Sequence, residues 1–344
     1  MTNNPQFQRP TLNFRGRKSP LTLTIGILVI LGAVFTAASG FYADWLWFKS
    51  VNFTSTWSTV LGTKAMLFVV IGLITALFVM FNVLLAYKRR PLYVPMTIEA
   101  DNLERYRSQI EPIRRGVFMA GFLALFYFAG TSGSTLWSTW LLFRNSTEFG
   151  VKDPQFNMDI SFFAFRLPFW QTLIGWGIST LVLSIIASVA VHYLYGGIRL
   201  QVREDRTTVA ARVQLSVLLG LVVLLKAVAY WFDRFALALK DSKLITGLTY
   251  TDVNAVLPAK AILTGIAIVC SLLFFANIVR RSWVLPAAGT ALLVISSVLI
   301  AGLYPAAIQT FQVKPSESAK EAEFIQRNID ATRAAYGLED VTVT

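Results

Sequence analysis

Lys226 is the residue whose position most invites a chemical role, because it is the one full charge deep inside a long apolar stretch. A charged side chain inside a membrane is costly, so it usually pairs with an opposite charge or marks an ion pathway. Asp44, near the end of the first apolar stretch, is the first candidate partner, and Asp233 is the second. The alternative is that Lys226 extends to the membrane interface, which Tyr230 and Trp231 indicate about one turn away. The sequence leaves an ion pair, this extension and ion transport open.

A second group of candidate residues lies in the stretch 153–169, DPQFNMDISFFAFRLPF. Asp153 and Asp159 could act as paired carboxylates or calcium ligands, but two acids without further oxygen donors form a weak calcium motif. The aromatic run in this stretch contains Phe162, Phe163 and Phe165. We expect the stretch either to dock an outer domain or partner, or to form a re-entrant loop whose rings lie in the membrane interface.

The stretch 250–258, YTDVNAVLP, is a second polar and apolar loop. Its polar side chains Tyr250, Asp252 and Asn254 could contact a partner or a substrate. A turn at the start of a helix explains the same residue types more simply, since Asp and Asn bond to nearby backbone groups. Both interpretations place this stretch at the same end of the molecule as 153–169.

Only one histidine, His192, and one cysteine, Cys270, occur in the chain. This excludes an internal disulfide and a His/Cys metal cluster, and it largely excludes a Ser-His-Asp hydrolase. His192 is interpreted as a hydrogen-bonding residue near a helix end, and Cys270 as a small packed hydrophobe. No phosphate-binding glycine loop or paired-histidine zinc motif is present. We therefore assign no catalytic residue and expect no cofactor or metal.

The composition predicts how these residues are positioned. Hydrophobic residues make up 55% of the 344 residues and charged residues 15%, whereas soluble domains are roughly one quarter charged. A membrane-spanning helix needs about 20 apolar residues. Seven stretches qualify, at 21–47, 65–87, 116–142, 168–195, 213–237, 261–279 and 283–304. The sequence thus predicts an all-α polytopic membrane protein with a polar arm at 1–20, a transmembrane domain at 21–304 and an outer segment at 305–344.

The charge distribution predicts the orientation, because Lys and Arg are retained on the cytoplasmic side. One side of the seven spans carries 17 basic and six acidic residues, and the other carries 13 of each. The N-terminus is therefore expected inside and the C-terminus outside. Because the inner charges flank spans, we expect them to contact anionic lipid headgroups and not nucleic acid.

The terminal segment predicts an amphipathic helix. Ser318 and Glu321 have the spacing of a capping box, and Gly337 is a helix stop. The expected apolar face contains Ala322, Ile325, Ile329, Thr332 and Tyr336. Such a face needs a cover, so we expect 305–344 to begin an extracytoplasmic domain that is otherwise absent.

Three blocks together resemble a known family: 153–169, 250–258 and YPAAIQTFQVKPSESAKEAEFIQRNIDATRAAYGL at 304–338. They are similar to uncharacterised protein family number 182, whose members are large bacterial membrane proteins common in actinobacteria. The resemblance covers nearly the whole chain. It implies seven N-terminal spans in the bacterial cytoplasmic membrane, followed by a large extracytoplasmic domain, and it supplies no catalytic residues.

Three functions remain to be weighed. The leading hypothesis is a membrane anchor or assembly subunit that presents an outer domain and binds other envelope proteins or a second copy of itself. The second is a transporter or channel for a lipid, an envelope precursor or an ion, which Lys226 and Asp44 motivate. The third is a membrane enzyme acting on lipid-linked substrates, with Asp153, Asp159 or Asp252 as general base.

Overall fold

The computed structural model describes residues 20–91, 98–199, 206–242, 245–280 and 284–341. Within these ranges the chain is all-helical, and pairing of extended backbone is limited to three isolated bridges. The α-helices are α1 (Pro20–Ser50), α2 (Thr54–Lys88), α3 (Ile98–Ile110), α4 (Arg114–Ser134), α5 (Trp137–Arg144), α6 (Leu167–Leu194), α7 (Val209–Ala236), α8 (Leu257–Arg280), α9 (Val284–Ser296), α10 (Tyr304–Ala307) and α11 (Glu317–Ala335). This confirms the predicted helical fold class.

The chain divides into two compact units, Met1–Gly62 and Thr63–Thr344. In the first unit, a tight turn joins α1 to the start of α2, and Asn52 adopts a left-handed backbone conformation there (φ 61°). The rings of Phe41 and Trp57 pack edge to face across this turn, with centroids 4.9 Å apart. This aromatic contact joins the end of α1 to the start of α2.

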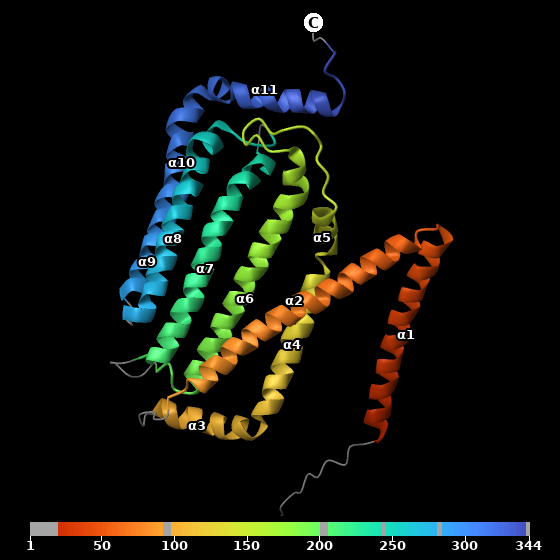
Figure 1. The fold of residues 1–344 in the computed structure, drawn as a ribbon, viewed down its shortest axis with the longest axis vertical. Helices are drawn as coiled ribbons and strands as arrows, with labels where there is room; N and C mark the ends of the chain where they lie inside the picture. The colour runs from red at the N-terminus through yellow and green to blue at the C-terminus, as the bar shows by residue number, and fades with distance from the viewer. Residues whose placement is uncertain (1–19, 92–97, 200–205, 243–244, 281–283, 342–344) are drawn as a thin grey trace, which may run out of the picture. The chain divides into compact units, whose positions relative to one another are not determined.

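The second unit is a helix bundle in which α7 packs against α6 and α8, and α9 packs against α8 (Figure 1). The buried core of these helices mixes Leu, Val and Ala with small polar side chains, while large apolar side chains remain on the outer surface. An apolar exterior is typical of a bundle surrounded by lipid, where Leu and Ile need no protein cover.

Glycines allow α2 and α4 to approach closely. A Cβ atom added at Gly72 would lie 2.6 Å from the Phe126 carbonyl oxygen, and one at Gly130 would lie 2.8 Å from the Phe68 carbonyl oxygen. Neither contact is sterically possible, so both positions require glycine. Small residues at helix contacts are typical of membrane bundles, because close backbones gain dispersion energy.

Seven helical stretches among the described residues are long and apolar enough to cross a membrane. They are Thr24–Ser50, Thr54–Lys88, Leu103–Ser134, Phe162–Leu194, Val209–Leu239, Asp252–Arg280 and Val284–Ala335. Each overlaps one predicted stretch. The third differs from its prediction: the helix expected at 116–142 ends at Ser134, and a turn at Thr135–Leu136 separates it from α5.

The last stretch also differs from its prediction. A π-helical turn at Ser297–Leu303 leads into α10. Beyond α10 the chain stays helical through a second π-helical turn at Ile308–Val313 and a 3-10 turn at Lys314–Ser316. Pro315 lies in that 3-10 turn, and proline removes a backbone donor and favours a change of direction. After this turn α11 lies across the ends of α6, α7 and α8 (Figure 1).

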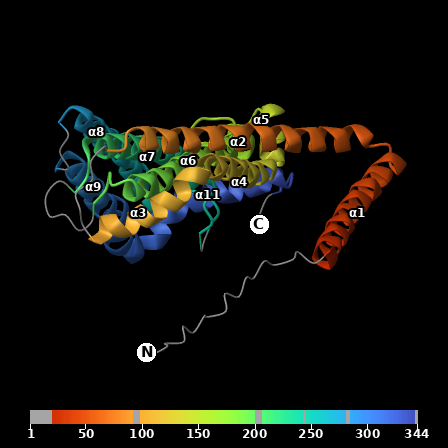
Figure 2. The ribbon, with the colours of Figure 1, turned by 90° about the horizontal axis from the view of Figure 1, so that it is seen from below.

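The second unit therefore has two ends, which we name by the helix lying across each. The α3 end contains α3, the last turn of α2, the start of α4 and the last turn of α6. The α11 end contains α11 and the loops before α6 and after α7. Figure 1 shows the two ends at opposite poles of the bundle, and Figure 2 gives the view from the α3 end.

Candidate functional site

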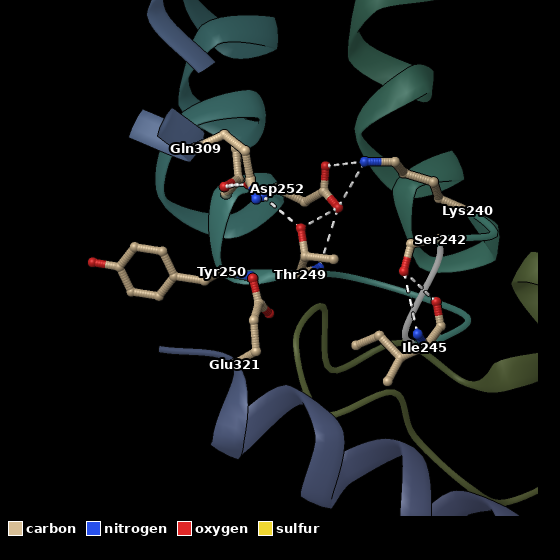
Figure 3. A network of polar contacts seen from close by, with 9 residues as sticks. Lys240, Ser242, Ile245, Thr249, Tyr250, Asp252, Gln309 and Glu321 are labelled. Carbon is tan, nitrogen blue, oxygen red and sulfur yellow. Dashed lines mark hydrogen bonds and ion pairs between the residues drawn. The ribbon is translucent and has the colours of Figure 1, made fainter. Parts of the chain in front are cut away.

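Asp252 is the centre of a polar network at the α11 end (Figure 3). Thr249 precedes the helical turn that begins at Tyr250, and its Oγ1 accepts the Asp252 backbone N–H at 3.3 Å. In return, the Asp252 carboxylate accepts the Thr249 backbone N–H at 3.2 Å and its hydroxyl at 2.8 Å. This reciprocal arrangement is a capping box, so the helix-entry interpretation of this stretch matches the geometry.

Lys240 completes the network. Its Nζ lies 2.7 Å from Oδ1 and 3.0 Å from Oδ2 of Asp252. Asp252 itself is fully buried. A buried carboxylate costs several kcal/mol unless it is paired and hydrogen-bonded, and here both oxygens are occupied. With no free oxygen directed at solvent, this carboxylate gives no support to a general-base role for Asp252.

The same network attaches α11 to the bundle. The Glu321 carboxylate on α11 is buried and accepts the Tyr250 backbone N–H at 3.0 Å. The Thr251 hydroxyl donates to Gln309, just before α11. The Lys320 ammonium lies 4.8 Å from the centroid of the Tyr250 ring. Asn254, in contrast, is exposed and donates to the Tyr250 carbonyl at 3.0 Å.

These contacts correct the expected start and face of α11. The helix begins at Glu317 with Ser316 as N-cap, two residues before the predicted cap Ser318, and Glu321 bonds to Tyr250 instead of closing a capping box. The buried side chains of α11 are Glu321 and Phe324, whereas Ile329 and Tyr336 are exposed. The expected apolar face is therefore not the face that contacts the bundle.

Asp153 and Asp159 both bond to the backbone of their own loop. Asp153 accepts the N–H groups of Gln155 and Phe156 at 2.9 and 2.7 Å. Asp159 accepts the N–H groups of Phe149, Gly150 and Ser161, and its contact with Ser161, followed by these backbone bonds, lowers the pKa of its carboxyl to about 2. Each acid thus shapes a turn. No group of three or more His, Cys, Asp or Glu side chains suited to a metal occurs in the described ranges.

The three phenylalanines of this loop differ in exposure. Phe163 is only 4% exposed and packs 5.9 Å from the Phe156 ring, so it belongs to the core. Phe162 is half-buried against Phe235, and Phe165 is half-buried against Phe149. The aromatic run therefore fixes the loop to the ends of the bundle and leaves only parts of Phe162 and Phe165 accessible.

A cavity of about 190 Å³ lies between residues 153–155, residues 245–248 of the segment that follows α7, and α11. Arg327 on α11 donates to the side chain of Gln155 at 3.2 Å, and Asn328 donates to the Thr246 carbonyl at 2.9 Å. Gln155 of the first predicted stretch and Tyr250 of the second, which bonds to Glu321, therefore both contact α11. The structure brings the two stretches together, as their expected placement at one end requires.

Lys226 is exposed on the surface of α7, and its ammonium lies 5.4 Å from the centroid of the Tyr230 ring. The extension of Lys226 to a membrane interface stays a prediction. The Asp233 carboxylate lies 3.4 Å from Lys260. Asp44 is exposed and belongs to the first unit, so its pairing with Lys226 stays a prediction.

A buried polar network that the sequence interpretation missed joins α2, α6 and α7. His192 is 1% exposed, and its Nε2 lies 3.0 Å from the side-chain oxygen of Gln214. Gln214 donates to the Asn82 carbonyl at 2.9 Å and to the Ser188 hydroxyl at 3.2 Å. His192 is thus a hydrogen-bonding residue, as predicted, but it lies inside the bundle. Asn82 and Gln214 within apolar stretches were the signal that could have revealed this network.

The α3 end holds a second polar network. The Glu111 carboxylate accepts hydrogen bonds from the hydroxyl of Tyr87 at 2.8 Å, from Arg114 at 2.5 Å and from the hydroxyl of Tyr195 at 3.3 Å. The Arg90 guanidinium stacks 4.3 Å from the Tyr87 ring centroid. Unlike Asp252, Glu111 keeps more than a third of its side chain exposed.

Comparison with known proteins agrees with the family resemblance. Residues 21–344 match the description "Uncharacterised protein family (UPF0182)". UPF0182 proteins of Streptomyces coelicolor and Nocardioides sp. are 48% and 44% identical to the chain over 95% and 98% of its length. A UPF0182 protein of Rhodococcus erythropolis is 42% identical over 95%. The matches cover 33%, 34% and 34% of these relatives, so the chain spans about a third of their length. No solved structure matches. The chain therefore belongs to the UPF0182 family, as its loop motifs predicted.

Proposed function

We propose that the chain is the membrane anchor of a bacterial cell-envelope protein, with seven spans in the cytoplasmic membrane and the α11 end on the extracytoplasmic side. In this role the α11 end is a platform that carries an outer domain and binds other envelope proteins or a second copy. The observation that carries the proposal is the attachment of α11 to both outer loops, through Glu321, Arg327 and Asn328.

A platform must hold the outer domain at a fixed position relative to the membrane helices, and this needs a rigid connection. The buried Asp252–Lys240 pair anchors the turn from which Tyr250 bonds to α11. The relatives' greater length supports the presence of further parts in the whole protein, and the charge asymmetry supports the orientation.

Orientation is the first point to test. Cys270 is buried and is the single cysteine, so introduced cysteines can be labelled against a low background. In intact cells, a membrane-impermeant maleimide should label Ser318→Cys on α11, and should label Arg105→Cys on α3 only after permeabilisation. The reverse pattern would overturn the proposed orientation and with it the outer platform.

Partner binding is the second point. The chain should be extracted from native membranes in a mild detergent and analysed by blue native electrophoresis and quantitative mass spectrometry. We expect a complex with envelope proteins or a second copy, and reduced recovery when Glu321→Ala frees α11, with Glu317→Ala on the same helix unchanged. Recovery of a monomer alone would contradict the assembly role.

A second candidate function is transport, and the buried network of Asn82, Ser188, His192 and Gln214 favours it. Polar side chains inside a bundle can form a proton or ion pathway, although they also stabilise helix packing. Flux of protons or of a tested cation into proteoliposomes that His192→Phe abolishes would select transport over anchoring. If proteoliposomes with the wild-type protein show no flux of protons or of the tested cation, the transport function is excluded.

A further inference from the structure

A cavity at the α3 end, which we name the α3 pocket, has a volume of about 420 Å³. Small-molecule sites usually measure roughly 300–1,000 Å³, so the α3 pocket is large enough for a chemical group of that class. The segment just after α2 supplies Arg90, α3 supplies Glu104 and Arg107, and Glu111 and Tyr195 lie in the same wall. None of these residues belongs to the α11 platform.

The charges around the α3 pocket leave an excess of guanidinium groups. The Glu111 carboxylate is already held by Arg114 at 2.5 Å and by two tyrosine hydroxyls. Glu104 is then the remaining carboxylate of the pocket wall, against the two guanidinium groups of Arg90 and Arg107. An anion entering the pocket would balance this excess.

Arg107 is held in place with one donor left over. Its Nε donates to the Leu194 carbonyl at 2.5 Å, which fixes the guanidinium plane at the end of α6. Its Nη2 is buried and has no hydrogen-bond partner among the described residues. A buried donor without a partner is destabilising, and a phosphate oxygen is a suitable acceptor for the planar guanidinium.

Arg90 is positioned by aromatic stacking instead of by a hydrogen-bonded carboxylate. Its Cζ lies 4.3 Å from the Tyr87 ring centroid and 5.4 Å from that of Tyr195. Its Nη1 is 3.8 Å from Glu111, which exceeds hydrogen-bond distance. The rings hold the cation while its N–H edge stays available to an anion.

The surroundings of the α3 pocket are apolar as well as basic. Tyr106 on α3 and Ile113 before α4 are 59% and 60% exposed, and Val117 on α4 is 44% exposed. Basic side chains are exposed beside them: Lys88 and Arg89 at the end of α2, and Arg115 at the start of α4. Apolar side chains beside a basic surface are typical of the headgroup region of a membrane, where an anion attached to acyl chains is the abundant ligand.

We propose that the α3 pocket binds the phosphate headgroup of an anionic phospholipid, with Arg90 and Arg107 as its ligands. The inference rests on the membrane location in the proposed function, but not on its orientation or its outer platform. The chemistry recognised is a phosphate with net negative charge, which a free phosphate ion shares and a zwitterionic headgroup lacks.

The test is native mass spectrometry of the delipidated full chain, titrated with dioleoyl phosphatidylglycerol, dioleoyl phosphatidylcholine or inorganic phosphate. We expect the wild type to retain phosphatidylglycerol over phosphatidylcholine. Arg107→Gln and, separately, Arg90→Gln should each weaken phosphatidylglycerol binding about tenfold, since each removes a charge-assisted contact. Arg105→Gln, an exposed α3 residue outside the pocket wall, should change binding less than about twofold.

Several outcomes would overturn the inference. Equal losses for Arg105→Gln and Arg107→Gln would mean diffuse attraction and no pocket. Equal retention of both lipids would exclude an anion site. Displacement of phosphatidylglycerol by inorganic phosphate at similar concentration would assign the pocket to a soluble anion. Because Arg107 also bonds to Leu194, Arg90→Gln keeps the test valid if Arg107→Gln misfolds, which thiol labelling of the buried Cys270 would reveal.

Discussion

The α11 end and the α3 end each centre on one carboxylate, but they use it differently. At the α11 end, Asp252 is buried, and Lys240 and Thr249 occupy both of its oxygens. At the α3 end, Glu111 is part-exposed beside a cavity of about 420 Å³, and Arg107 retains a donor without a partner. A closed network serves to fix helices, whereas an open one can still bind a ligand. The Asp252 network therefore holds helices together, whereas the network around Glu111 leaves room for a small anionic ligand.

Breaking the buried ion pair should have the largest effect. Lys240→Met leaves the Asp252 carboxylate buried without its cation, and we expect a loss of about 3 kcal/mol, low in the range for such pairs because Lys240 is half exposed. Cys270 is buried, so the rate of its reaction with a thiol dye during heating measures unfolding.

Two further variants test the cause of that loss. Lys260→Met breaks the Lys260–Asp233 pair, whose carboxylate is 37% exposed, and should cost less than about 1 kcal/mol. Adding Asp252→Asn to Lys240→Met removes the buried charge and should restore part of the stability. If both lysine variants lose the same amount, burial of Asp252 is not the cause.

Releasing α11 should have an intermediate effect. Glu321→Ala leaves the Tyr250 N–H without its acceptor and should cost about 1–2 kcal/mol. The loss should be local, so hydrogen exchange should speed up across Glu317–Ala335 while α7 and α8 stay protected. Glu317→Ala, exposed one turn earlier, is the matched control. Unchanged exchange in Glu321→Ala would show that other contacts hold α11.

Neutralising the carboxylate of the α3 end should matter less for stability. Glu111→Gln weakens its contacts with Arg90 and Arg114, but all three side chains are more than a third exposed, so we expect a smaller loss of stability than in Lys240→Met. The same Cys270 assay measures this, with the exposed Glu104→Gln as control. A loss as large as that of Lys240→Met would remove the distinction between a closed and an open network.

The sequence predicted the helical class, the family and the shared placement of the stretches 153–169 and 250–258, because apolar length and loop motifs are local signals. It did not predict that Glu321 contacts Tyr250 instead of capping its own helix. Nor did it predict that Lys240 pairs with Asp252, since that pair depends on how the loop after α7 returns to the bundle. The lone charge Lys226 lies on the surface, whereas the neutral polar residues Asn82 and Gln214, within apolar stretches, form the buried network.

The smallest effect concerns Asp159, which shapes its loop without being buried in an ion pair. Its folded pKa of about 2 lies below the ordinary 3.8, so the charged form stabilises the loop. This contribution is complete above about pH 4 and is lost as the pH falls through about 2. Hydrogen exchange at the Gly150 and Ser161 amides, corrected for intrinsic rates, should stay slow at pH 3 and become fast near pH 2.

Asp159→Asn should make the Gly150 and Ser161 amides exchange fast at every pH, because an amide oxygen accepts three N–H bonds less well than a carboxylate. Asp241→Asn, an exposed acid in the other loop, should leave them unchanged. Protection lost already at pH 4 would mean that the bonds to Phe149, Gly150 and Ser161 do not hold the carboxylate charged. The loop would then owe its shape to the Phe163 contacts alone, and the α11 end would be fixed by packing more than by its acids.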